Sequence, residues 1–285
     1  MAATPLQEHT MHNIKIIALD LDGTLLNSNK ELTPVSSAAL YRAAETGIHI
    51  VPTTGRFYGG MPEEIRQLPF IKYAITINGA QVAELESGEV IYKAEIPCHQ
   101  AVQIMEFLDD YPVIYDCYQN NAAWMTAKMK ELIDETVSSV HYRKMLHELR
   151  QPVPELKQIL LQRNEGVQKI QFFTKNPEVR LCLMDELPKR FDDLCISSST
   201  DDNVEINQKR ANKGEALLAL GTHLDVRREE ILAFGDGYND LSMLKMAGVG
   251  VAMANACDEA KAVSDRIALS CDEDGVAHFI EEFCL

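Results

Sequence analysis

The sequence lacks any apolar run long enough to cross a membrane, and it carries little positive charge. Its longest stretch without charge, Met246–Cys257, is rich in small residues and broken by glycines, whereas a transmembrane helix needs about 18 or more apolar residues. Lys and Arg number 27 against 43 Asp and Glu, a formal net charge of −16. We therefore expect neither a membrane nor a nucleic-acid partner, because nucleic-acid binders need clustered positive charge. The N-terminus has no basic region followed by an apolar core, so we expect no secretory signal and a cytoplasmic protein.

Sequence patterns of metal–thiolate, disulfide and mononucleotide sites are also missing. The seven cysteines are odd in number and form no CxxC pair, and neither HExxH nor GxxxxGK occurs. We expect reduced thiols rather than a disulfide framework or a zinc ribbon. With 46% hydrophobic and 25% charged residues, the composition is that of a globular chain with one large or two modest domains.

Both ends of the chain alternate short apolar runs with helical patterns. Thr33, Pro34 and Gly47 cap, open and stop a helix between two such runs. Expected strands are 14–19, 48–53 and 73–77 near the start, and 231–234 and 249–253 near the end. This order predicts an α/β fold with a doubly wound, Rossmann-like parallel sheet.

The middle of the chain follows a different pattern. Residues 81–96 read as a hairpin with a Ser87-Gly88 turn, and paired strands are expected around Asn120-Asn121. Helices and further strands continue to residue 206. We therefore predict a discontinuous core domain of residues 1–85 and 208–285 with an α+β domain of residues 86–207 inserted in it. Residues Met1–His12 carry no signal of an element, and we expect them to fray.

Two carboxylates, Asp20 and Asp22, follow the first expected strand, with Gly23 allowing a sharp exit. Open α/β sheets place their ligand sites at the carboxyl ends of their strands. Two like charges this close repel unless a cation joins them, and Mg²⁺ prefers oxygen ligands. A plain Asp-Gly turn is the alternative. A calcium-binding EF-hand is excluded because its sixth loop position would be Leu25 instead of glycine.

A second acidic cluster follows the strand expected at 231–234. It holds Asp236, Asn239 and Asp240 within the string GDGYND. The string superficially resembles a dinucleotide-binding loop, but Asp240 stands where the third glycine belongs, and acidic groups would repel a pyrophosphate. We predict a metal-binding role instead.

Thr54, Gly55 and Arg56 follow the second expected strand, and Lys213 opens a helix. Alone, each would be structural or exposed to solvent. Together with the acids they supply the hydroxyl, the cations and the metal site that phosphoryl transfer requires.

The strings DLDGT, TTGR, NKGEAL and GDGYNDLSML, in this order, resemble the four motifs of the haloacid dehalogenase superfamily. TGR followed by INGA, and GDGYND followed by AGVGVAMANA, resemble its Cof-type phosphatase subfamily. That subfamily carries a large α/β cap between its second and third motifs, which here corresponds to the interval from Asn78 to Lys213.

The resemblance implies a mechanism. Asp20 would attack phosphorus and form an aspartyl-phosphate, and Asp22 would act as general acid and then base. Thr54 and Lys213 would hold the transferring phosphoryl group. Mg²⁺ would be bound by the Asp20 carboxylate, the Asp22 carbonyl and the Asp236 carboxylate, while Asn239 and Asp240 would complete the shell or position Lys213.

Residues at the strand ends and on the cap are candidates to contact the rest of the substrate. They are Gly55, Arg56, Asn78 and Asn239 on the core, and Tyr115, Tyr118 and Trp124 on the cap. Packing on the cap's own helices is the stronger expectation for these three, because aromatic residues in alternating strand patterns usually pack that way. We expect a Mg²⁺-dependent phosphatase of small phosphorylated metabolites, sugar phosphates or phosphorylated cofactor precursors. The alternatives are a hexose phosphomutase of the same superfamily and a non-catalytic protein that binds a phosphorylated ligand. No feature of the sequence predicts the oligomeric state or the individual metabolite.

Overall fold

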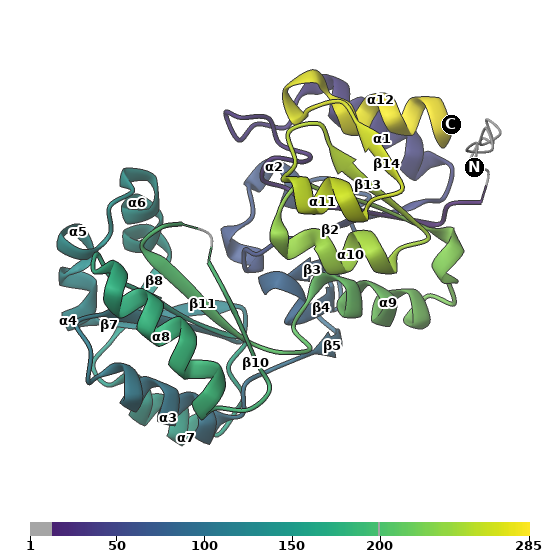
Figure 1. The fold of residues 1–285 in the computed structure, drawn as a ribbon. Helices are drawn as coiled ribbons and strands as arrows, with labels where there is room; N and C mark the ends of the chain where they lie inside the picture. The colour runs from purple at the N-terminus through teal and green to yellow at the C-terminus, as the bar shows by residue number, and fades with distance from the viewer. Residues whose placement is uncertain (1–12, 199) are drawn as a thin grey trace, which may run out of the picture.

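The molecule consists of two sheet-based parts joined by two crossings of the chain (Figure 1). The computed structural model describes residues 13–198 and 200–285, so the expected fraying of Met1–His12 lies outside the described residues. Both ends of the described chain lie in one part, and the middle of the chain forms the other. We call these parts the core and the cap.

The core is built around a five-stranded parallel sheet with the order β14-β13-β12-β1-β2. Its central strand β1 lies between β2 from the start of the chain and β12 from the end, with Ile16 opposite both His49 and Ile231. The predicted doubly wound core is therefore confirmed. The strands are β1 (Ile16–Leu19), β2 (His49–Pro52), β12 (Ile231–Gly235), β13 (Val249–Met253) and β14 (Arg266–Ala268).

Helices cover both faces of this sheet because its buried strands are apolar on both sides. Ile17 and Leu19 pack in one cluster with α1 and α12, whereas Ile16 and Ala18 pack in another with α9. Thr33 caps α1 by accepting a hydrogen bond from the main-chain N–H of Ser36, as predicted. The core helices are α1 (Pro34–Glu45), α2 (Glu63–Arg66), α9 (Lys213–His223), α10 (Leu241–Met246), α11 (Asp258–Val263) and α12 (Gly275–Phe283).

The strand expected at 73–77 runs parallel to the end of β2, as predicted, but it belongs to a separate sheet. It forms β3 (Tyr73–Thr76), which pairs antiparallel with β4 (Gln81–Glu84), and β4 pairs with β5 (Val90–Lys93). One bridge from Thr53 to Ile75 links this three-stranded sheet to the end of β2. The hairpin predicted at 81–96 is present. The predicted domain boundaries, at residues 85/86 and 207/208, stay a proposal. The pairing of β3 with β4, and of β4 with β5, places the hairpin with the core.

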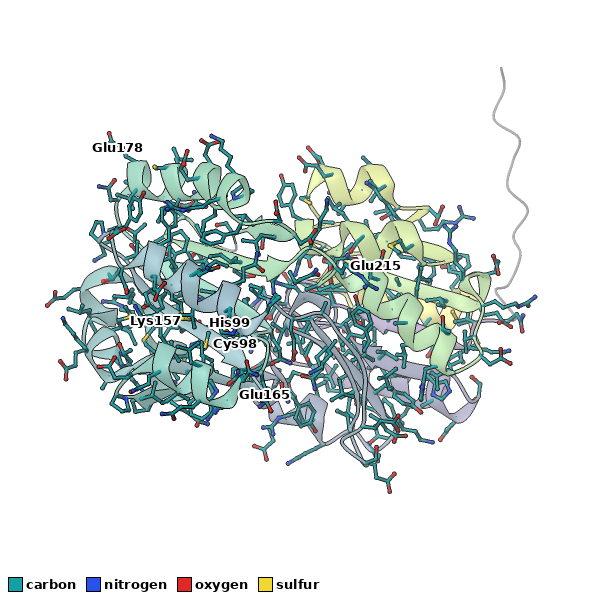
Figure 2. The ribbon with its side chains drawn as sticks, turned by 90° about the horizontal axis from the view of Figure 1, so that it is seen from below. Cys98, His99, Lys157, Glu165, Glu178 and Glu215 are labelled. Carbon is teal, nitrogen blue, oxygen red and sulfur yellow. The ribbon has the colours of Figure 1, made fainter. Side chains whose placement is uncertain are left out.

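The cap contains a six-stranded, mostly antiparallel sheet with the order β10-β11-β9-β6-β7-β8. One face packs on α3, α7 and α8 through an apolar cluster that includes Cys117, Ile170 and Phe172. The strands are β6 (Ile114–Gln119), β7 (Ala122–Thr126), β8 (Arg150–Val153), β9 (Lys169–Phe173), β10 (Leu194–Ser197) and β11 (Asn203–Gln208). The helices are α3 (Cys98–Leu108), α4 (Ala127–Glu131), α5 (Ile133–Thr136), α6 (Val140–Leu149), α7 (Leu156–Arg163) and α8 (Pro177–Arg190). In the view from below, Cys98 and His99 mark the start of α3 on the cap side, and Glu215 marks α9 on the core side (Figure 2).

Short 3₁₀ turns connect several of these elements. Two of them, η2 (Ile77–Gly79) and η4 (Tyr238–Asp240), follow strands β3 and β12 and hold residues that the sequence analysis marked as site candidates. The others are Tyr58–Gly60, Arg228–Glu230 and Cys271–Glu273. Asn255 lies two residues before Cys257, the N-cap of α11, and does not cap that helix. Asn255 instead donates to the carbonyl of Gly23 and accepts from the N–H of Cys271, so it joins loops.

Candidate active site

Most of the predicted site residues of the core line one cavity between the core and the cap. Asp20 directly follows β1, Thr54 lies just beyond β2, and Asp236 follows β12, so three parallel strands deliver them to the same edge of the sheet. The cavity measures about 360 Å³. Its core wall includes Asp20, Asp22, Thr54, Gly55, Arg56, Asn78, Asp236 and Asn239, and its cap wall includes Tyr118, Tyr142, Met145, Lys169, Gln171 and Glu205.

Lys213 lies beneath the cavity and joins two of the carboxylates. It is the first residue of α9, whose N-cap Asn212 accepts from the N–H of Glu215. Its Nζ lies 2.6 Å from Oδ1 of Asp20 and 2.6 Å from Oδ1 of Asp240, and its side chain is fully buried. Gly79 lets the η2 turn approach this helix end, since its φ is +89° and an added Cβ would lie 2.3 Å from the carbonyl oxygen of Asn212.

Burial is the largest single influence on the pKa values of Asp20 and Lys213. It raises the pKa of Asp20 to about 8; Lys213 opposes this rise, and the neighbouring Asp240 and Asp236 add to it. Burial alone would lower the pKa of Lys213, but the two carboxylates outweigh it and raise the pKa. Lys213 therefore stays an ammonium.

The acidic cluster fits a divalent cation. Carboxylate oxygens of Asp20, Asp236 and Asp240 all lie within 4.8 Å of one another. Burial, and next the charge of Asp240, raise the pKa of Asp236, because the acids repel one another in a buried site. Gly23 (φ +91°) leaves room for Asp236, because a Cβ there would lie 2.5 Å from Asp236 Oδ2.

The three acids are not equally available to a cation. Asp240 is fully occupied, since Oδ1 accepts from Lys213 and Oδ2 accepts from the N–H groups of Asp236 and Gly237, each at 2.9 Å. Thr24 donates to Oδ1 of Asp236 at 2.9 Å, which leaves its Oδ2 toward Gly23. Asp20 and Asp236 are therefore the better candidates for metal ligands, and Asp240 positions Lys213.

Asp22 is held by two cations. Nε of Arg56 donates to Oδ2 and Nη2 donates to Oδ1, both at 2.8 Å, and Lys30 lies 3.2 Å away. Burial alone would raise the pKa of Asp22, but Arg56 and Lys30 outweigh burial and lower it. In this conformation Asp22 is ionised and ready to accept a proton rather than to donate one.

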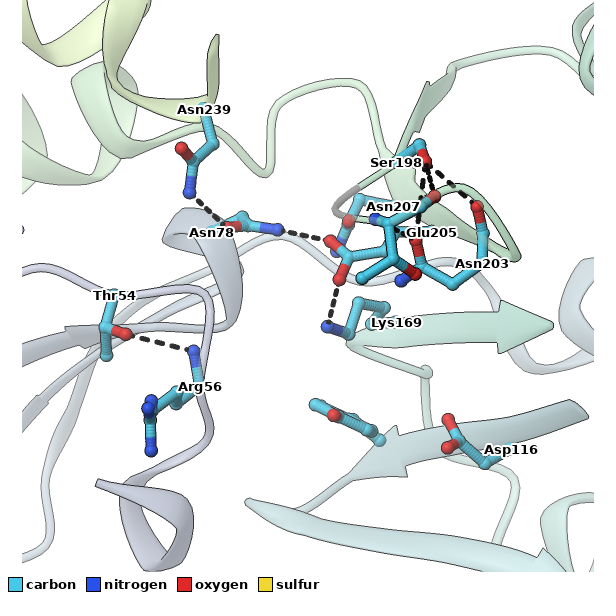
Figure 3. Close-up of polar contacts among 12 residues, drawn as sticks. Thr54, Arg56, Asn78, Asp116, Lys169, Ser198, Asn203, Glu205, Asn207 and Asn239 are labelled. Carbon is cyan, nitrogen blue, oxygen red and sulfur yellow. Dashed lines mark hydrogen bonds and ion pairs between the residues drawn. The ribbon is translucent and has the colours of Figure 1, made fainter. Parts of the chain in front are cut away.

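A chain of amide contacts runs from the core to the cap beside the cavity. Asn239 donates through Nδ2 to Oδ1 of Asn78 at 3.2 Å, and Asn78 donates through Nδ2 to Oε2 of Glu205 at 2.9 Å. Figure 3 shows Asn78 between the other two, with Lys169 beneath Glu205. Thr54 lies on the core side, where its hydroxyl accepts from the N–H of Arg56 at 3.2 Å. Asn239 thus contacts Asn78, whereas the contact to Lys213 is made by Asp240.

Only one of the three candidate aromatic residues on the cap reaches the cavity. Tyr118 lines it. Tyr115 belongs to the apolar cluster on the opposite face, where its hydroxyl donates to Asp109, and Trp124 packs against that cluster under Arg163. Tyr115 and Trp124 thus follow the stronger expectation and pack on the cap's own helices, because their side chains leave the sheet on the face opposite Tyr118.

Sequence reasoning did not single out the polar side chains of the cap wall. Lys169 and Gln171 alternate with apolar residues at the start of KIQFF, and Glu205 lies between the apolar residues of NVEINQ. That period-two pattern would have identified them as one face of a buried sheet. Tyr142 and Met145 come from α6, a helix that was not predicted although Ser139 caps it.

Comparisons with known proteins find relatives that match nearly the whole chain. A family model of haloacid dehalogenase-like hydrolases matches residues 17–280. Phosphatase YwpJ of Bacillus subtilis is 32% identical over 94% of this chain and 99% of its own length. The 5-amino-6-(5-phospho-D-ribitylamino)uracil phosphatase YcsE of the same organism is 29% identical, with 96% and 97% covered. A solved haloacid dehalogenase-like hydrolase from Bacteroides thetaiotaomicron superposes with a TM-score of 0.80 at 30% identity, covering 94% of this chain and 98% of the other.

None of the helices in residues 13–198 and 200–285 is both long enough and apolar enough to cross a membrane.

Proposed function

The chain belongs to the haloacid dehalogenase-like hydrolases and is a Cof-type phosphatase, and we propose that it hydrolyses phosphate monoesters of small metabolites in a Mg²⁺-dependent reaction through an aspartyl-phosphate on Asp20. The observation that carries the proposal is Lys213, a buried ammonium 2.6 Å from both Asp20 and Asp240. This contact fixes the Asp20 carboxylate and supplies positive charge where the phosphoryl oxygens would lie.

In the first step, a carboxylate oxygen of Asp20 attacks phosphorus, and the bond from phosphorus to the leaving-group oxygen breaks. The Thr54 hydroxyl, the main chain at Gly55 and the Lys213 ammonium hold the three remaining oxygens. Asp22 donates a proton to the leaving oxygen. Because Arg56 lowers the pKa of Asp22, Asp22 must turn from Arg56 and take up a proton from solvent before it can make this donation.

In the second step, water attacks the phosphorus of the aspartyl-phosphate, and Asp22 accepts the proton of that water. The acyl–phosphate bond breaks, inorganic phosphate leaves and Asp20 is restored. The ionised state of Asp22 next to Arg56 suits this step directly.

We assign the metal to Asp20, Asp236 and the main-chain carbonyl of Asp22, with Asn239 at its edge. When bound, Mg²⁺ supplies positive charge that brings the phosphoryl group and the Asp20 carboxylate together. Asp240 supports the site by holding Lys213.

The test is hydrolysis of p-nitrophenyl phosphate with Mg²⁺ or with EDTA, using the wild type, Asp20→Asn and the control Asp258→Asn. Asp258 is an exposed acid in the first turn of α11. We expect release that needs Mg²⁺, is lost in Asp20→Asn and is kept in Asp258→Asn. Release that persists in Asp20→Asn would refute the assignment of the nucleophile.

Two alternative functions predict different results. A hexose phosphomutase would return phosphate to a sugar, so it would consume a sugar bisphosphate without stoichiometric inorganic phosphate. A non-catalytic binding protein would bind phosphorylated ligands without turnover and without trapping label on Asp20.

A further inference from the structure

A chain of three side chains connects the cap to the edge of the proposed metal site. Glu205 lies on β11 of the cap, Asn78 lies in the η2 turn of the core, and Asn239 lies in the η4 turn that follows β12. Nδ2 of Asn78 is 2.9 Å from Oε2 of Glu205, and Oδ1 of Asn78 is 3.2 Å from Nδ2 of Asn239 (Figure 3). We call these three residues the relay. Glu205 is 8% and Asn78 9% exposed, so little water competes for the contact between them.

The hydrogen-bonding chemistry of Glu205 gives the relay a direction. A carboxylate only accepts hydrogen bonds, whereas an amide accepts through its oxygen and donates through its nitrogen. Asn78 must therefore turn Nδ2 toward Glu205, which leaves its Oδ1 for the neighbour on the other side. Asn239 must in turn donate from Nδ2 to that oxygen. The Oδ1 atom of Asn239 then remains for a further partner.

Lys169 keeps Glu205 in the form that only accepts hydrogen bonds. Its Nζ lies 3.2 Å from Oε1 of Glu205, and the two side chains are 2% and 11% exposed. Burial alone would lower the pKa of Lys169, but nearby groups, Glu205 first among them, outweigh burial and raise it. An ammonium in this position favours the ionised carboxylate, which has no proton to donate to Asn78.

The main chain holds the middle residue of the relay in place. The N–H of Asn78 donates to the carbonyl of Thr54 at 3.1 Å, and the N–H of Ile77 donates to the carbonyl of Arg56 at 2.9 Å. Ile77 has a φ of +54° and Asn78 a φ of +56°, in a region that a β-branched residue such as Ile77 rarely adopts. Such a conformation persists only where its surroundings hold it. The η2 turn therefore presents the Asn78 amide in one place between the core and the cap.

The oxygen that the relay leaves on Asn239 lies over the loop that begins at Asp236. An added Cβ on Gly237 would lie 2.9 Å from Oδ1 of Asn239. All three residues line the cavity. Because Mg²⁺ is bound by oxygen atoms, the relay in this direction offers the cation a ligand atom, directly or through a bound water. The reverse direction would offer it an NH₂ group.

We propose that Glu205 is a positioning residue of the cap, which acts through Asn78 to turn the oxygen of Asn239 toward the metal site. This inference rests on the proposed function, since it takes the Mg²⁺ site to be at Asp20 and Asp236. Because Glu205 belongs to the cap and the two amides belong to the core, the relay is complete only when cap and core are docked as they are here. Docking of the cap and binding of the cation thus strengthen one another, and this coupling is reciprocal.

Glu205→Gln is expected to reverse the relay. Lys169 has only N–H groups to offer, so it would keep the oxygen of the glutamine amide, and the nitrogen of that amide would face Asn78. Asn78 would then accept from this nitrogen and donate to Asn239, which would turn its NH₂ group toward the metal site. The variant has the shape of the wild type and keeps the contact to Lys169, so it should fold. Its Kd for Mg²⁺ should rise about 3- to 10-fold, the range that one net hydrogen bond controls.

The measurement is thermal unfolding of the full chain without substrate, across a Mg²⁺ titration with EDTA as the zero point. The dependence of Tm on Mg²⁺ concentration gives Kd. Glu106→Gln makes the same chemical change at an exposed acid of α3 and should leave Kd unchanged. Asn78→Gly removes the middle amide while tolerating the positive φ, and it should also raise Kd. A merely structural role of Glu205 would lower Tm in EDTA and leave Kd as in the wild type.

A comparison in the Asn239→Asp background tests the direction of the relay. A carboxylate at position 239 offers the cation an oxygen whichever way Asn78 turns, so adding Glu205→Gln to this variant should not raise Kd further. An unchanged Kd in either Glu205→Gln or Asn78→Gly would overturn the inference, and so would an equal loss from Glu205→Gln in both backgrounds. A wild type whose Tm does not respond to Mg²⁺ would instead contradict the metal site of the proposed function.

Discussion

Asp236→Asn is expected to remove about half or more of the stabilisation that Mg²⁺ gives to the folded protein. Asp236 is a cavity-lining acid close to Asp20 and Asp240, and one of its oxygens accepts from Thr24. The asparagine keeps an oxygen that can accept this hydrogen bond, and it removes one of three mutually repelling carboxylates. The variant should therefore fold, and its melting temperature in EDTA should be no lower than that of the wild type.

The size of the effect follows from binding linkage. A cation that binds only the folded state at 100 times its Kd stabilises it by about 2.7 kcal/mol, which raises Tm by about 5–11 °C for a domain of 150–250 residues. Removing groups that merely orient metal ligands weakens metal binding about 10- to 100-fold, and losing a ligand should cost at least as much. The stabilisation at the same Mg²⁺ concentration then falls to about 0.4–1.4 kcal/mol, or about 1–6 °C.

The assay is thermal unfolding of the full chain across a Mg²⁺ titration, with EDTA as the zero point. Asp258→Asn makes the same chemical change at an exposed acid and should keep the wild-type response. An Asp236→Asn protein whose Tm rises with Mg²⁺ as steeply as that of the control would refute the metal assignment.

Four further predictions concern single residues. Asp20→Asn should abolish turnover and leave the circular dichroism spectrum unchanged; normal turnover would contradict the nucleophile assignment. Asp22→Asn should lower kcat by about 10²–10⁴-fold, measured at saturating substrate, and an unchanged rate would remove its acid–base role. Arg56 lowers the pKa of Asp22, so Arg56→Ala should move the limb of the pH–rate profile that titrates Asp22 to higher pH; an unshifted limb would show that Asp22 does not titrate there. Hydrogen bonds from Arg227 and Lys15 lower the pKa of Glu230 to about 2, so its stabilisation is complete above about pH 4.5 and is lost toward pH 2. Urea unfolding of Glu230→Gln should accordingly show a deficit at pH 7 that disappears near pH 2, and an equal deficit at both pH values would contradict this.

Local signals in the sequence predicted where the core strands end and which polar residues follow them. Asp20, Thr54 and Asp236 could be brought together because parallel strands deliver their carboxyl ends to one edge of a sheet. Both ends of α1 were also predictable from adjacent residues, because Thr33 directly precedes the helix and Gly47 follows it.

Features decided by distant partners were not predictable. The apolar string of β3 suits a parallel or an antiparallel neighbour alike, and its pairing with β4 is set by the hairpin that follows. Which strand face meets the cavity depends on the docking of the cap, so Tyr115 and Tyr118 could not be told apart by composition. Asn255 resembles a helix cap locally, but Gly23 and Cys271 compete for its side chain.

The place of β1 in the core sheet has a consequence for protein synthesis. Ile16 pairs with His49 on one side and with Ile231 on the other, so one edge of β1 has no native partner until the end of the chain is made. The cap strands β6 to β11 lie between these partners in sequence and can pair with one another earlier. The cap therefore can fold on the ribosome while the edge of β1 is still open to foreign strands. A ribosome stalled before β12 would hold a folded cap attached to an unfinished sheet, and that species is the one most in need of a chaperone.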